Sequence, residues 1–182
     1  MFSDLTLWFS NYQIVSCRLA FETTLDTKLR DFQYKLLNLI VFTNKKLYQF
    51  KMVESPLCVF CNEEEESLEH LLYFCKSSTF VWKELLSWLA DEANILLNVS
   101  HLDILFGKFD LDKDFLLVNH IILLAKYFIY KCKLSKASPL LTVFKAKLKA
   151  TYKLELYTAK RNGILINHYK KWDHLLSLGF LD

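Results

Sequence analysis

The stretch CVFCNEEEESLEHLLYFC, residues 58–75, decides the fold. It places Cys58, Cys61, His70 and Cys75 within eighteen residues. Three thiolates and an imidazole fill the four positions of a tetrahedral zinc site and leave none open for a substrate. The Cys-x-x-Cys pair predicts a tight turn that presents both sulfurs to one ion. We therefore predict one structural Zn²⁺ ion.

The segment that returns the histidine is predicted to be a short helix. It begins at Ser67, directly after the acidic run 63–66. Cys75 follows His70 by five residues, roughly 140° around a helix of 3.6 residues per turn. Since the two side chains cannot share one helical face, we expect the helix to end or bend just before Cys75.

Two other interpretations of the cysteines are weaker. Chance grouping is disfavoured because three of only five cysteines fall in this window, beside one of five histidines. A thioredoxin-like redox pair needs a strand before it and a helix directly after it, whereas Pro56 precedes the pair and an acidic loop follows. Cys17 and Cys132 are predicted to be ordinary buried thiols.

The cell compartment follows from the same cysteines. An odd cysteine count with a metal pattern suits a reducing, intracellular location, nuclear or cytoplasmic, better than a disulfide framework. No secretory signal is evident, because Asp4 interrupts the first apolar stretch.

The composition predicts an all-α protein. Hydrophobic residues make up 53% of the chain, with only three glycines and two prolines, which favours helices joined by short loops. We expect short helices around the Cys-Cys-His-Cys zinc knuckle, followed by a basic helical bundle. The predicted segments are an apolar lead-in (1–24), a zinc-binding domain (25–92), a connector (93–113) and a basic helical C-terminal segment (114–182).

Helix signals divide the front half. Thr27 is a candidate cap for a helix with an apolar stripe over residues 29–40, and Thr43 for a second helix that buries Leu47 and Phe50. Ser77 or Ser78 is predicted to open a third helix after the knuckle, and a short apolar contact is expected at residues 104–106 of the connector.

The back half is predicted to contain three helices. The first, about 114–135, includes an apolar run that is interrupted by polar residues, so it is expected to be a buried core helix and not a membrane span. Ser138-Pro139 is a start signal for the second, which Asn162-Gly163 stops after Arg161. The third runs over about 164–177.

Charge is spread unevenly along the chain. Residues 126–171 hold twelve Lys or Arg residues and one acidic residue, Glu155, so this segment carries +11 and the rest of the chain −8. Such a segment predicts RNA or DNA binding through phosphate contacts that weaken steeply with salt. The candidate contacts are Lys126, Lys131, Lys133, Lys145, Lys149, Lys153, Lys160, Arg161, Lys170 and Lys171. Tyrosines and a tryptophan between them either stack on bases or pack in the core. A helix lying on an acidic membrane is a weaker interpretation, because the zinc unit gives it no support.

The sequence shows no motif of an active site. It contains no glycine-rich phosphate loop, Gly-x-Ser-x-Gly elbow, His-Glu-x-x-His or paired aspartates for two magnesium ions. We predict that the chain is not an enzyme and has no small-molecule substrate.

These residues resemble a known family, the carboxy-terminal zinc-binding region of LINE-type (non-LTR) retrotransposon reverse transcriptases. The resemblance rests on residues 28–38, Thr43-Asn44, Leu47, residues 55–61 and 64–72, Cys75 and Trp82, and on residues 119–122 and 168–172 of the basic tail. In that family the segment helps to hold RNA and target DNA for target-primed reverse transcription. The resemblance implies that Cys58, Cys61, His70 and Cys75 are the zinc ligands.

The polymerase's aspartate motif and the endonuclease of that family are missing here, which implies an accessory piece or a truncated remnant. The sequence thus predicts a zinc-stabilised nucleic-acid-binding segment without catalytic domains. One alternative is a structural or protein-interaction module whose basic face meets an acidic protein. Another is one piece of a longer enzyme.

Overall fold

Helices make up the regular structure that a computed structural model describes for residues 14–108 and 115–181. Residues 1–13 of the predicted lead-in, residues 109–113 of the connector and residue 114 of the next helix lie outside the described residues. The elements are a helix over 14–23, α2 (Thr27–Leu37), α3 (Asn44–Gln49), η1 (His70–Phe74), α4 (Lys76–Asp91), α5 (His101–Phe106), α6 (Phe115–Ser135), α7 (Leu141–Arg161) and α8 (Leu165–Ser177). Among the described residues, extended pairing is limited to one bridge between Leu57 and Glu65, so the all-α prediction is confirmed.

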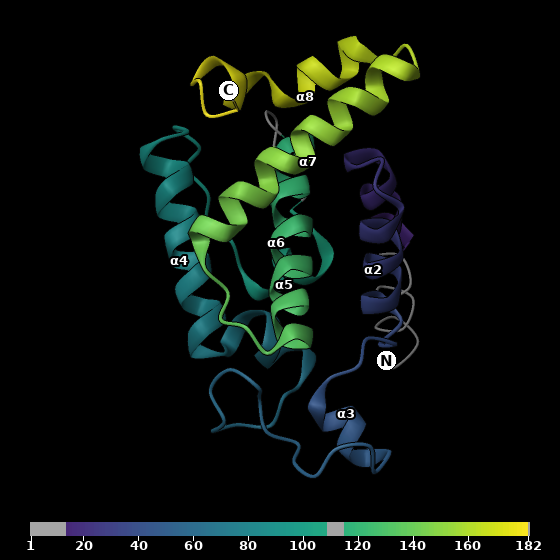
Figure 1. Ribbon diagram of the computed structural model, residues 1–182, viewed down its shortest axis with the longest axis vertical. Coiled ribbons are helices and arrows are strands. Elements are labelled where there is room, and N and C mark those ends of the chain that lie inside the picture. The colour runs from purple at the N-terminus through teal and green to yellow at the C-terminus, as the bar shows by residue number, and fades with distance from the viewer. Residues whose placement is uncertain (1–13, 109–114, 182) are drawn as a thin grey trace, which may run out of the picture.

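Helix α6 is the centre of the fold. It packs against α2, α5, η1, α7 and α8, and α7 crosses it diagonally in Figure 1. By length and composition α6 could span a membrane, but 72% of its apolar window is buried inside the structure. The prediction of a buried core helix is therefore confirmed.

Two predictions about helix α2 are wrong. Asp26, not Thr27, is the N-cap of α2, and its carboxylate accepts the backbone N–H of Lys28 at 2.8 Å. The helix ends at Leu37, which leaves Ile40 outside it and 45% exposed.

Helix α3 is capped by Thr43 as predicted, but it buries none of its residues. With only six residues it is too short to present an apolar stripe, and Phe50, which follows it, is 58% exposed. Hydrogen bonds hold α3 instead: the Asn44 backbone N–H donates to Glu66 Oε1 at 2.7 Å, and Asn44 Nδ2 donates to the Leu57 carbonyl at 2.9 Å.

The back half follows the prediction with one exception. The second helix of this half begins at Leu141 with Leu140 as its N-cap, so Ser138-Pro139 precedes the helix and does not open it. The stop at Asn162-Gly163 is confirmed, as is the apolar contact in the connector, where Ile104 and Leu105 of α5 are buried.

Four helices end by the same backbone device. Leu39, Lys51, Lys136 and Gly163 each adopt a φ between 53° and 69° just after a helix. In each case the following residue's N–H returns to the carbonyl five residues back, the hydrogen bond of a Schellman motif. Three of the four positions are not glycine, so this chain ends helices with few glycines.

A buried ionic cluster joins the C-terminal helices to the front half. Glu155 of α7 accepts hydrogen bonds from Lys171 Nζ (2.7 Å), the Trp172 indole (3.1 Å) and the Thr24 hydroxyl (2.9 Å). Burial alone would raise the pKa of Glu155, but the charges of His120 and Lys171 and the hydrogen bonds from Lys171 and Thr24 outweigh burial and lower it to about 2.

His120 of α6 completes this cluster. Its ring is fully buried against Trp172, and its Nδ1 lies 3.7 Å from Glu155 Oε1. Burial, with the charge of Lys171, lowers the pKa of His120 to about 3, although Glu155 opposes the shift. The imidazole is therefore neutral in the folded protein at pH values where the unfolded chain protonates it.

This difference predicts a pH dependence of stability. As pH falls from 6.5 toward 3, unfolded His120 binds a proton that folded His120 does not, so wild type loses up to about 1.4 kcal/mol of unfolding free energy per pH unit. His120→Gln removes this contribution. Urea unfolding of both proteins between pH 7.5 and 5 measures this. The amount by which the unfolding free energy of His120→Gln lies below that of wild type should decrease as pH falls. Because zinc-ligand protonation affects both proteins alike, two parallel stability curves would contradict the assignment.

Candidate metal centre

A tight turn positions the first two cysteines. The Cys58 N–H donates to the Glu64 carbonyl and the Asn62 N–H donates to the Cys58 carbonyl, both at 2.8 Å. Asn62 adopts φ 54°, a left-handed conformation that asparagine tolerates better than most residues. The turn thus closes the Cys-x-x-Cys segment on itself, and the bridge between Leu57 and Glu65 holds its two ends together.

A wide helical turn supplies the other two donors. The Ser67 hydroxyl accepts the backbone N–H of His70 at 3.0 Å, and residues His70–Phe74 then form the π-helical turn η1. The turn closes with the Cys75 N–H donating to the His70 carbonyl at 2.7 Å. Cys75 itself is extended, with ψ 135°, so the helix ends just before it as predicted. A five-residue turn brings the sulfur and the imidazole to the same point, which an α-helical turn would not do.

Helix α4 fastens η1 from the other side. The Ser78 hydroxyl, the Thr79 hydroxyl and the Trp82 indole donate to the carbonyls of Leu71, Tyr73 and Leu72, at 2.6, 2.7 and 2.7 Å. The prediction that Ser77 or Ser78 caps this helix is wrong: Cys75 is its N-cap residue, and Ser78 satisfies a carbonyl of η1 instead.

The four donors meet at one point. One ligand atom from each of Cys58, Cys61, His70 and Cys75 lies within 4.8 Å of the other three. Cys58 Sγ and Cys75 Sγ are 3.7 Å apart, and Cys61 Sγ is 3.4 Å from His70 Nε2. Two thiolates at about 2.3 Å from a tetrahedral zinc lie about 3.8 Å apart. The distance between the Cys58 and Cys75 sulfurs matches a shared ion and is far too long for a disulfide.

The two buried thiols, those of Cys58 and Cys75, differ in acidity. Contact with the Cys58 thiol lowers the pKa of Cys75 to about 5, and the backbone N–H groups of Ser77 and Ser78 act in the same direction. The same contact, with burial, raises the pKa of the Cys58 thiol. Since zinc is bound by deprotonated cysteines, its binding here would displace that retained proton.

Two glutamates of the acidic run support the donors. Glu64 Oε2 lies 3.1 Å from His70 Nδ1, without the alignment of a hydrogen bond. A carboxylate at this ring nitrogen leaves Nε2 for the metal. Glu66 is fully buried, and its carboxylate accepts the backbone N–H groups of Asn44 and Val59 and lies 3.4 Å from Lys133 Nζ. Glu66 therefore ties the knuckle to α3 and α6.

The comparison with known families follows this geometry. Residues 6–82 match the model of a family described as zinc-binding in reverse transcriptase. The match includes all four donors and ends at Trp82, inside α4. No curated protein and no solved structure matches the chain. The predicted structural zinc ion is confirmed by the donor set and this family match.

The predicted nucleic-acid contacts divide into two groups. Lys126 and Lys133 of α6 are buried, and the Lys171 side chain is 8% exposed against Glu155. Lys126 Nζ donates to the Ile104 and Leu105 carbonyls, and burial lowers its pKa to about 7. These three ammonium groups therefore make their contacts inside the protein. The others reach the surface, fully or in part: Lys131, Lys145, Lys149, Lys153, Lys160, Arg161 and Lys170.

Zinc content tests the site. Purified wild-type protein should contain about one zinc ion per chain, and Cys61→Ser should lose most of it, because the hydroxyl that replaces the thiol is a poor zinc ligand. Metal analysis by mass spectrometry checks this. Cys17→Ser, at a half-buried thiol outside the site, is the control and should keep its zinc. Equal zinc in wild type and Cys61→Ser would rule the site out.

Glu66 and Glu63 offer a matched pair of variants. Glu66→Ala removes a buried carboxylate and leaves Lys133 without its anion, so it should cost about 3 kcal/mol of unfolding free energy. Glu63 is 56% exposed and pairs with Lys76 at the surface, so Glu63→Ala should cost less than about 1 kcal/mol. Denaturant unfolding of the zinc-loaded proteins measures both values. Similar costs would show that Glu66 is not a structural link.

Proposed function

We propose that this protein is the zinc-stabilised accessory segment of a LINE-type reverse-transcriptase tail, and that it holds RNA or DNA inside the cell through phosphate contacts. The proposal assigns it no reaction, small-molecule substrate or membrane. The zinc centre supports this proposal, because it holds the front half of the chain against α6. The observation that carries it is the net charge of +11 over residues 126–171.

The exposed cations lie mainly along α7 and α8. Lys153, Lys160, Arg161 and Lys170 are exposed. Phosphates attract such groups without regard to sequence, so the proposed binding is electrostatic and sensitive to salt.

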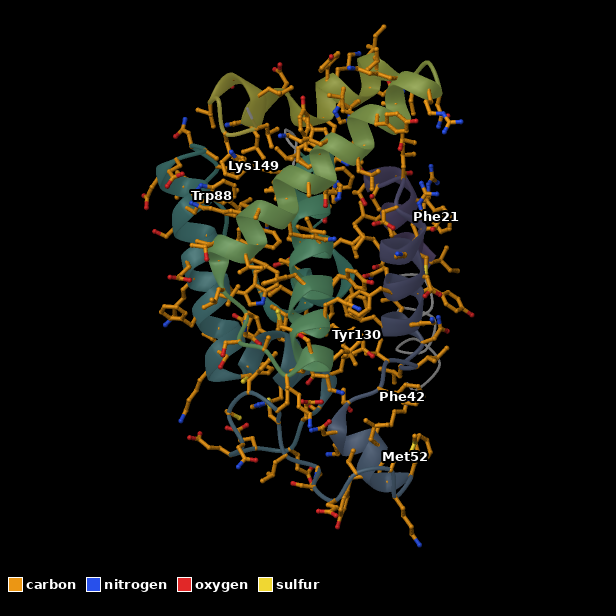
Figure 2. All side chains as sticks on the ribbon, viewed as in Figure 1. Phe21, Phe42, Met52, Trp88, Tyr130 and Lys149 are labelled. Carbon is orange, nitrogen blue, oxygen red and sulfur yellow. The ribbon has the colours of Figure 1, made fainter. Side chains whose placement is uncertain are left out.

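Two lysines of α7 are already engaged. Lys145 lies 3.5 Å from Glu92 and 4.8 Å from the centre of the Trp88 ring, and Lys149 lies 5.0 Å from the centre of the Phe180 ring. Figure 2 labels Lys149 on α7 and Trp88 on α4. We therefore assign the main phosphate contacts to the later turns of α7 and to α8.

A protein-interaction module is the second candidate. Exposed apolar side chains beside the zinc unit favour it, with Leu39 65%, Phe50 58% and Met52 68% exposed. Nucleic-acid titration distinguishes the two candidates, because apolar contacts with a protein do not require phosphates.

Charge reversal tests the proposed function. Lys153→Glu with Lys160→Glu should weaken binding to RNA and duplex DNA and lower the slope of log K against log salt by about 1.4 for single strands, since two phosphate contacts are lost. Anisotropy titration at several salt concentrations measures both effects. Lys51→Glu with Lys83→Glu changes the net charge equally, but on exposed lysines of the acidic front half. Equal weakening by the two double variants would refute the assignment of this surface.

A further inference from the structure

An aromatic groove lies between α2 and α6. It is a cavity of about 280 Å³ with both apolar and charged walls. Phe32 of α2 and Tyr127 and Tyr130 of α6 provide rings, and Ile40 and Phe42 line it from the loop after α2. The rings of Phe32 and Tyr130 stack with their centres 5.3 Å apart. The centre of the Tyr127 ring lies 5.2 Å from the centre of the Phe32 ring.

Phe42 is the ring best placed to receive a ligand. Its carbonyl accepts a hydrogen bond from Lys133 Nζ at 2.9 Å. Yet its side chain is 47% exposed. Figure 2 shows Phe42 and Tyr130 on the side of α6 that faces α2. The buried Lys133 thus holds the Phe42 backbone while the ring stays open, which lowers the entropy cost of stacking.

Lysines border this groove. Lys28 and Lys131 are exposed and form no ion pair within residues 14–108 and 115–181, whereas Lys35 is paired with Asp31 at 2.7 Å. Lys28 also lines a neighbouring cavity of about 350 Å³ between the start of α2 and α7, which Lys147 lines from the opposite side. Positive charge therefore continues from the groove toward α7.

The acids of this region do not cancel the charge. Besides Asp31, which pairs with Lys35, two carboxylates line the cavity next to α7. Glu155 is offset by Lys171, and Asp26 keeps its negative charge while it caps α2. Lys28, Lys131 and Lys147 outnumber that one remaining carboxylate, so phosphates are attracted here.

We propose that the groove between α2 and α6 is a subsite for an unpaired base of single-stranded nucleic acid, with Phe42 as its stacking ring and Lys28 and Lys131 as phosphate contacts. This inference rests on the proposed function and names its ligand class. Open rings bordered by lysines are how proteins bind single strands, because any base can stack on a ring. A duplex conceals its base faces, so it would contact the lysines alone.

The test compares a labelled uridine oligonucleotide with an abasic strand of the same length. The strands share their phosphates and differ in their bases. Wild type should bind the uridine strand about tenfold more tightly, within the range measured for stacking of one base. Phe42→Ala should lose that advantage while its affinity for the abasic strand stays unchanged. Phe50→Ala removes another exposed ring, one that does not line the groove, and should behave as wild type.

The outcomes distinguish a failure of the base subsite from a failure of the proposed nucleic-acid binding. Equal affinity of wild type for both strands, or an unchanged preference in Phe42→Ala, overturns the base subsite and leaves the groove to a protein partner. Binding of both strands that remains salt-dependent would still support the proposed function. No binding of either strand at low salt, by folded and zinc-loaded protein, overturns both. Zinc content and circular dichroism of each variant confirm that it is folded.

Discussion

The convergence of four soft donors on one point is the constraint on which the front half depends. Between α3 and η1 the chain has almost no regular structure, only a tight turn and one bridge. Such a segment buries too little apolar surface to fold alone, so metal binding must supply its stability. The structure shows how the backbone reaches that point: a left-handed Asn62 closes the knuckle, and the five-residue turn of η1 swings Cys75 back beneath His70. The contacts that connect the zinc unit to the rest of the protein depend on this geometry.

The zinc unit is connected to the rest of the protein by polar contacts as well as by packing. Glu66 accepts backbone N–H groups of Asn44 and Val59, which belong to α3 and the knuckle, and faces Lys133 of α6. At the other end of α6, His120 lies against the Glu155–Lys171 pair that joins α7 and α8. The central helix therefore carries buried polar groups near both ends and, at Lys126, in its middle. This arrangement fixes the register of the surrounding helices, because sliding α6 by one turn would leave a buried charge unpaired.

The sequence could predict those features that depend on residue type and spacing. The four donors, the end of the helix before Cys75, the Thr43 cap and the stop at Gly163 all follow from local chemistry. The end of α2 could not be located, since Leu39 adopts a left-handed conformation that its residue type does not favour. Glu66 could not be told apart from its three acidic neighbours, because its burial depends on Lys133, which is distant in sequence. The same long-range packing placed Phe50 outside the core.

Tertiary structure also changes what the charge of the basic segment means. A count along the sequence treats all twelve cations of residues 126–171 as available to a polyanion. In the folded protein Lys133 and Lys171 offset buried carboxylates, and burial brings the pKa of Lys126 to about 7, so part of its charge is lost near neutral pH. Lys145 and Lys149 lie over aromatic rings. The exposed positive charge of this segment therefore comes from fewer groups: those on the later turns of α7 and on α8, together with Lys131, Lys136 and Lys147. Because Lys131 borders the aromatic groove and the others do not, that groove is where exposed charge and the exposed ring of Phe42 coincide, and Lys147 and Lys28 line the path from α7 to it.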